Sequence, residues 1–199
     1  MSRIIREAQM SDMADIMAVM DAAKKIMRQS GNMHQWGDGY PSEAVISADI
    51  ERHGGFVVED GDGEHQSPGK VVGYFAFLPS PEPTYARIYE GEWLDDERPY
   101  HVVHRIASYP DVHGVFCSIM DYCFSHDPNI RVDTHRDNTI MQHNLAKYGF
   151  SYCGIIYLAS GGTLGQGSHA ARSNFSACQS KKGTQERLAY QKYLQERDK

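Results

Sequence analysis

The chain has 199 residues, 41% hydrophobic and 23% charged, a composition and length that suit one globular domain with a substantial core. The formal net charge of −6 disfavours a nucleic-acid partner, because phosphate backbones are bound by a basic field that the chain as a whole lacks. No apolar run approaches the ~18 residues of a membrane span, and the N-terminus lacks the apolar stretch of a signal peptide, so we expect a cytoplasmic protein without a membrane partner.

Hydrophobic periodicity predicts strands and helices in the first half of the chain. A short strand at 3–8 precedes a helix with apolar residues at helical spacing, which Gly31 can end. A second helix is expected to begin near Pro41–Ser42. Two strands follow, at 55–60 and 70–79, and a polar turn separates them.

In the second half, strands and helices alternate. The segment 82–100 is mixed, and we interpret it as a strand plus a loop. The later elements are a strand at 100–108, a helix at 111–126, a strand at 129–135, a helix capped by Asn138 and closed by Gly149, and strands at 151–158 and 187–194. Residues 160–184 are rich in Gly and Ser and predict a flexible insertion before the last strand. The order β-α-α-β-β-β-α-β-α-β-β predicts an α/β fold, a mixed sheet with helices on both faces.

The segment HRIASYPDVHGVFCS, residues 104–118, is typical of a strand, a sharp turn and a helix start. A helix N-terminus offers unpaired N–H groups and a positive dipole end, which suit a phosphate group. A phosphate-binding loop usually contains two or three glycines, whereas this turn contains Gly114 alone. On this pattern, a coenzyme loop and an ordinary strand-to-helix connection both remain open.

The order of the motifs resembles the GNAT superfamily of N-acetyltransferases. IASYPDVHGVFCS aligns without gaps with the family pattern L-A-V-x-P-x-x-R-G-x-G-x-G/A, and the later segment from RVDTH through Asn138 to KYGF resembles the second family signature. QWGDGYP and RLAYQK are similar to a loop and the last strand of one bacterial branch, which also has an HRIA motif. The resemblance covers nearly the whole chain except residues ~160–184.

This resemblance implies one N-acetyltransferase domain over 1–199, with a mostly antiparallel twisted sheet of about seven strands. It implies direct transfer of an acetyl group from acetyl-CoA, as co-substrate, to a primary amine of a small molecule, amino acid or peptide. The class also allows a homodimer. The expected coenzyme-binding residues are Ile106, Ala107, Ser108, His113, Gly114, Val115, Phe116, Cys117, Ser118 and Asn138. Phe116 stands where the family has a glycine, and it could instead pack in the core. Asn138 could serve as a helix N-cap, a role that can coexist with coenzyme binding.

By the same resemblance, His104 is the expected general base, because some family members carry a catalytic histidine or glutamate on that strand. An imidazole has an ordinary pKa of about 6.5, which suits proton transfer near neutrality. Strand alternation predicts that His104 shares a face with Ile106, with Arg105 on the other face. A structural histidine is the alternative, and the other candidate bases are Glu90, Glu92, Asp133 and His135.

For the general acid, the chain departs from the family pattern. Many members place a tyrosine seven residues after the asparagine, where this chain has Leu145. Tyr148 lies three residues further, near the same helical face, and is the candidate acid. Core packing of Tyr148 and a thiolate protonated by water are the alternatives. The N–H of Ala107, or of a neighbour, is the expected donor to the developing oxyanion.

The acceptor pocket is expected around Trp36, Asp38 and Tyr40, whose loop walls the pocket in the resembling proteins, together with Asp133 and His135. Asp38 would attract an ammonium group, whereas an aromatic staple closing the loop is the alternative. The ten histidines have no recognised metal-binding spacing, so no metal is expected. A non-catalytic acyl-CoA-binding or regulatory domain remains the rival function.

Overall fold

The computed structural model describes residues 3–37, 39–61, 69–159 and 184–195. Its elements form one seven-stranded sheet in the order β1-β2-β3-β4-β5-β7-β6, in which every neighbouring pair is antiparallel except β4 and β5. The strands are β1 (Arg3–Glu7), β2 (Gly55–Asp60), β3 (Val71–Pro79), β4 (His101–Ser108), β5 (Asn129–Thr134), β6 (Ser151–Ala159) and β7 (Thr184–Tyr193). The expected mixed, mostly antiparallel sheet is therefore confirmed.

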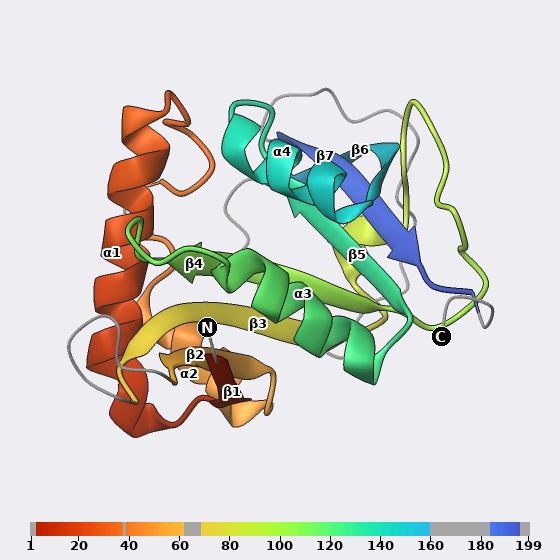
Figure 1. Cartoon of the computed structure of the whole chain (residues 1–199). Helices are drawn as coiled ribbons and strands as arrows, with labels where there is room; N and C mark the ends of the chain where they lie inside the picture. The colour runs from red at the N-terminus through yellow and green to blue at the C-terminus, as the bar shows by residue number, and fades with distance from the viewer. Residues whose placement is uncertain (1–2, 38, 62–68, 160–183, 196–199) are drawn as a thin grey trace.

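Four α-helices cover the sheet, α1 and α2 on one face and α3 and α4 on the other (Figure 1). They are α1 (Met13–Gln29), α2 (Glu43–Glu51), α3 (Val115–His126) and α4 (Thr139–Tyr148), with short 3-10 helices η1 (Met10–Asp12) and η2 (Pro83–Tyr85). No helix in the described part of the chain has both the length and the apolar character that a bilayer crossing requires.

The ends of α4 confirm the capping expected from the sequence. Asn138 Oδ1 accepts a hydrogen bond from Met141 N at 3.1 Å and so satisfies a free N–H group of the first turn. Gly149 ends the helix with φ of 92°, a left-handed conformation that glycine adopts without steric cost. The insertion expected at about 160–184 falls almost wholly outside the described residues, and β7 begins at its last position.

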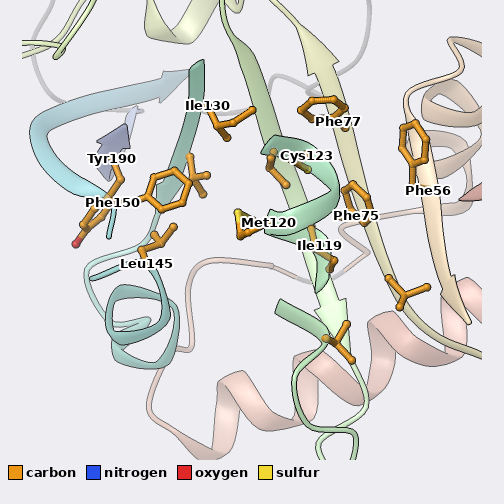
Figure 2. Close-up of a cluster of buried hydrophobic side chains, with 14 of the residues drawn as sticks. Phe56, Phe75, Phe77, Ile119, Met120, Cys123, Ile130, Leu145, Phe150 and Tyr190 are labelled. Atoms are coloured by element: carbon orange, nitrogen blue, oxygen red, sulfur yellow. The ribbon is translucent and has the colours of Figure 1, made fainter. Parts of the chain in front are cut away.

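The largest hydrophobic cluster lies between the sheet and the α3–α4 layer (Figure 2). Helix α3 contributes Ile119, Met120 and Cys123, which recur at helical spacing and are completely buried. Figure 2 shows them between Phe75 of β3 and Leu145 of α4. Burying a side chain of this size stabilises the fold by roughly 1.5–3 kcal/mol, so this cluster fixes α3 against the sheet.

The prediction of a strand within 82–100 is wrong. The segment contains η2 and a loop, and its only described pairing is the isolated bridge between Tyr89 and Ile155. Side-chain packing holds the segment, because Arg131 of β5 places its guanidinium 4.0 Å from the ring of Trp93 and 3.8 Å from that of Tyr100. The apolar residues that suggested a strand therefore serve this packing.

A β-bulge interrupts the β3–β4 ladder at Arg105 and Ile106, which together oppose a single residue of β3. Arg105 has φ of 55°, and its side chain reaches Asp49 of α2, while Ile106 packs in the cluster beneath α3. The expected common face for His104 and Ile106, with Arg105 opposite, is therefore wrong. Simple alternation fails because the bulge inserts one residue.

Candidate active site

The parallel strands β4 and β5 pair at only two positions, His101 with Ile130 and Val102 with Arg131. Beyond them the strands diverge toward their carboxyl ends (Figure 1), and a cleft lies where they part. The lining comes from both strands, the α1–α2 connection, α4, β6 and β7: Met27, Gln35, Trp36, Tyr40, Val103, His104, Arg105, Ile106, Val132, Asp133, Asn138, Met141, Leu158 and Arg187. Carboxyl ends of strands are where α/β sheets bind ligands.

His104, the expected base, lines this cleft and is 9% exposed. Its Nδ1 lies 3.7 Å from Asp133 Oδ1, and its Nε2 lies 3.5 Å from Glu82 Oε2. Both separations are too long for good hydrogen bonds, and Nε2 is buried with no hydrogen-bond partner in the described structure. The imidazole is therefore positioned by charge and packing, and its Nε2 makes no hydrogen bond within the described structure.

Two carboxylates flank His104. Glu82, at the start of η2, accepts hydrogen bonds from Thr84 Oγ1 at 2.9 Å and Thr84 N at 3.3 Å. Burial alone would raise the pKa of Glu82, but His104 and the Thr84 donors outweigh burial and lower it to about 2. Asp133 Oδ1 accepts from the Tyr85 hydroxyl at 2.7 Å. Glu82 is absent from the sequence-based candidates because only the folded 82–100 segment brings it to His104.

Two of the expected acceptor residues form one wall of the cleft. Trp36 is 8% exposed and meets Tyr40 edge-on, with ring centroids 6.5 Å apart. Tyr40 also accepts a hydrogen bond from Arg105 Nη1 at 3.3 Å. Asp38 lies outside the described residues. Trp36 and Tyr40 therefore form the aromatic staple that was the alternative to an acceptor site, and they also line the cleft.

The remaining candidate bases lie outside the cleft lining. His135 is half-buried beside the ring of His34, and burial, followed by the nearby Arg187, lowers its pKa. Glu90 and Glu92 are exposed. Among all the proposed bases, the structure thus brings only His104 and Asp133 into the cleft.

Gln35 is a half-buried link that sequence reasoning did not identify as a site residue. Its Oε1 accepts hydrogen bonds from Asn32 Nδ2 at 2.9 Å, Asn138 Nδ2 at 2.7 Å and Thr134 Oγ1 at 3.4 Å. Its carbonyl oxygen accepts from Arg187 Nη2 at 3.0 Å. One residue therefore ties the α1–α2 connection to β5, α4 and β7. Because Asn138 uses its amide for Gln35 and for its own cap, the capping interpretation holds for it.

The N-terminus of α3 is open, as a coenzyme loop requires. Its N-cap residue, Gly114, has φ of 82° and no side chain caps the helix. Ser118 N bonds to Gly114 O, so the orphan N–H groups of the first turn are those of residues 115–117. His113, Gly114 and Cys117 are exposed, while Val115 is buried and Ser118 half-buried. These N–H groups and the helix dipole suit a phosphate group.

Three expected coenzyme residues end β4. Ile106 lines the cleft, Ala107 is 3% exposed, and Ser108 is half-buried. Tyr109 N donates to Val72 O of β3 at 3.2 Å. Because N–H groups alternate between the two sides of a strand, this bond directs the N–H of Ala107 toward β3 as well. Neighbours of Ala107 are the remaining candidates for the oxyanion donor.

Tyr148, the candidate acid, is not among the cleft-lining residues. Its hydroxyl donates to Asp121 Oδ1 of α3 at 2.6 Å, and its ring packs edge-on against Phe116 with centroids 6.1 Å apart. Burial, followed by the Asp121 carboxylate, raises the pKa of Tyr148. Phe116 itself is half-buried against the main cluster. The structure thus gives both aromatic residues packing roles between α3 and α4.

Within the described residues we find no metal-binding cluster, and their cysteines form no disulfide. No group of three or more His, Cys, Asp or Glu side chains among them is arranged to hold a metal ion. Cys117, Cys123 and Cys153 are free thiols.

No protein-family model matches the sequence, and no curated protein matches it. Solved structures do resemble it. An acetyltransferase of the GNAT family from Listeria monocytogenes has 18% identity over 96% of this chain and 95% of its own, with a TM-score of 0.61. A putative acetyltransferase from Staphylococcus aureus has 20% identity over 96% and 99% of the two chains, with a TM-score of 0.59. These two likenesses support the fold.

A third structure is similar in sequence as well. The GNAT-family acetyltransferase from Streptococcus agalactiae has 30% identity to this chain, covers 98% of it and 96% of its own length, and superposes with a TM-score of 0.74. That likeness spans the diverging strands, the cleft and the open helix N-terminus described above. The chain belongs to the GNAT family of acetyltransferases.

Proposed function

We propose that this protein transfers an acetyl group from acetyl-CoA directly to a primary amine of a small molecule, amino acid or peptide. One observation carries the proposal: His104, with an unpartnered ring nitrogen, lies in the cleft where β4 and β5 diverge. Family membership supports acyl transfer in general, and this cleft supplies a place for it.

In this proposal the coenzyme lies along the carboxyl end of β4 and meets the N-terminus of α3. The free N–H groups of residues 115–117, with Gly114 ahead of them, would hold its pyrophosphate. Gly114 leaves the approach open, since a Cβ built there meets no heavy atom within 4 Å. The side chain of Phe116 packs against Tyr148, so its backbone donor stays available.

The acceptor amine attacks the thioester carbonyl carbon, a C–N bond forms and the C–S bond breaks. His104 takes the proton that the nitrogen loses, and the flanking carboxylates of Glu82 and Asp133 stabilise the imidazolium that results. Cleft-side N–H groups of β4 stabilise the negative charge that develops on the carbonyl oxygen. Since Tyr148 is bonded to Asp121, the departing sulfur takes its proton from water or from protonated His104.

The experiment measures thermal unfolding with and without acetyl-CoA, using NAD and ATP as controls, and then release of the coenzyme thiol with a panel of amines. A ligand at about 100 times its dissociation constant stabilises a fold by ~2.7 kcal/mol. Stabilisation by acetyl-CoA alone, followed by amine-dependent thiol release, is expected. No stabilisation at millimolar acetyl-CoA would overturn the proposal. Stabilisation without thiol release would favour a non-catalytic acyl-CoA-binding domain, for which the placement of Tyr148 outside the cleft lining is the favouring observation.

A further inference from the structure

Arg187 of β7 is a buried cation in the lining of the cleft, with 5% of its surface exposed. Its Nη2 donates to Gln35 O and to Gln185 Oε1, both at 3.0 Å, and its Nε lies 3.4 Å from Asp133 Oδ2. Its third nitrogen, Nη1, is buried and has no hydrogen-bond partner among the residues that the structure describes. A residue of the cleft lining therefore has one guanidinium nitrogen whose N–H donors are unused.

The other arginine in the cleft lining has a complete set of partners. Arg105 makes a two-point contact with Asp49 at 2.7 Å from Nε and 2.7 Å from Nη2, and its Nη1 donates to Tyr40. Buried polar groups are almost always hydrogen-bonded, and a buried donor left without a partner is costly. Arg105 is thus a structural ion pair, whereas Arg187 keeps donors that an anion can use.

The charges around Arg187 match a molecule that carries both an amine and an acid. Asp133 lies between Arg187 and His104, with one carboxylate oxygen near each. Glu82 adds a second negative charge on the far side of His104. The cleft lining therefore holds a cation, Arg187, and a base, His104, with the Asp133 carboxylate between them. Burial, as the first cause, lowers the pKa of Arg187, and a bound anion would offset that cost.

We propose that Arg187 binds a carboxylate of the acceptor, which makes the acceptor an amino acid or a similar small amine that bears a carboxylate. A planar guanidinium with free N–H groups is the side chain best suited to a carboxylate. The acceptor amine then lies toward Asp133 and His104, where the proton is removed. This inference rests on the proposed function and names the substrate class for the same site.

The test compares matched acceptors with the wild-type protein: free amino acids, their carboxamides and the corresponding amines without the acid group, for example phenylalanine, phenylalaninamide and phenethylamine. We expect kcat/KM to be about 10- to 100-fold higher for the free acids, the range given by one charged hydrogen-bonded contact. Equal rates for acids and carboxamides, or faster acetylation of the carboxamides, would overturn the inference while leaving the acetyltransferase function standing.

Arg187→Gln removes the charge and should erase the preference for free acids over carboxamides, both measured in the same variant, mostly through KM. Arg187→Lys keeps the charge but loses the fixed N–H donors of the guanidinium, and should give an intermediate ratio. Arg136→Gln is the matched control, because Arg136 is exposed, pairs with Glu186 and lies outside the cleft lining. A preference that survives in Arg187→Gln would also overturn the inference.

A binding measurement separates this inference from the proposed function. Thermal unfolding of the wild-type protein saturated with coenzyme A is compared with each free acid and each carboxamide. Stabilisation by acids alone, lost in Arg187→Gln, would support the carboxylate site even if no amine were acetylated. If neither acids nor carboxamides stabilise the protein and none is acetylated, the inference fails together with the function.

Discussion

Glu82 Oε2 lies 3.5 Å from His104 Nε2, although Glu82 is the N-cap of η2 and His104 belongs to β4. The loop that carries Glu82 is held by the stacking of Tyr85 on Trp93, with ring centroids 5.4 Å apart, and not by a strand ladder. The side chain of Glu82 is 15% exposed, so its charge acts on His104 in a place largely removed from water.

Because of this contact, we expect the free energy of unfolding to decrease as the pH falls through the acidic range. The pKa of Glu82 is lowered from 4.5 to about 2 in the folded chain, so its contribution is complete above pH 4.5 and disappears as the pH falls to about 2. We expect the free energy of unfolding, measured with urea across this range, to fall less steeply in Glu82→Gln. Glu97→Gln, on an exposed residue of the same segment, is the control and should follow the wild type.

His104→Ala removes the proposed base. Turnover with a good amine acceptor should fall by about 100-fold or more, the usual contribution of a general base. The affinity for acetyl-CoA, measured by calorimetry, should change little, because the proposed coenzyme site lies at the α3 N-terminus and the end of β4. Turnover equal to wild type at every pH would remove His104 from the mechanism.

Asp49→Ala leaves the buried guanidinium of Arg105 without its two-point partner and removes the acceptor of the Tyr74 hydroxyl at 3.0 Å. Breaking such a buried pair costs about 3–5 kcal/mol, and urea unfolding measures it. The double variant with Arg105→Met should lose less than the sum of the single variants. Additive losses would show that the pair contributes no coupling. Asp21→Ala, at an exposed α1 position, should cost no more than about 0.5 kcal/mol.

Gly114→Ala tests the coenzyme loop. Gly114 and Gly31 have φ of 82° and 88°, and a Cβ at either would meet no heavy atom within 4 Å. Each change to alanine should cost about 1–2 kcal/mol through the left-handed backbone alone. Acetyl-CoA affinity, read from thermal stabilisation, should weaken only in Gly114→Ala, since its methyl group enters the proposed phosphate approach. Equal affinities in the two variants would place the phosphate elsewhere.

Local sequence signals predicted much of this fold. The order of strands and helices follows from hydrophobic periodicity, and the cap at Asn138 and the stop at Gly149 follow from residue types whose local bonding is nearly independent of the rest of the chain. His104 was found because a motif fixes its place on β4, and the structure puts it in the cleft.

The features that the sequence did not predict depend on contacts between distant segments. The bulge at Arg105 is set by how β4 registers against β3, which the sequence of β4 alone does not contain. Gln35 and Arg187 belong to the motifs QWGDGYP and RLAYQK, but only the fold brings their side chains to the cleft. Glu82 reaches His104 from a loop whose path no motif marks. Tyr148 faces Asp121 because packing against α3 sets the rotation of α4.

The ladder between β4 and β5 has only two positions, so the two halves of the sheet are joined by backbone pairing at one end alone. Beyond these two positions no ladder pair joins β4 to β5 in the described structure, so side chains set the width of the cleft between them. Val103 of β4 and Val132 of β5 are two of the side chains that line the cleft. We expect changes of side-chain size at these two positions to alter the width of the acceptor that the proposed site admits, with His104 and the α3 N-terminus left in place.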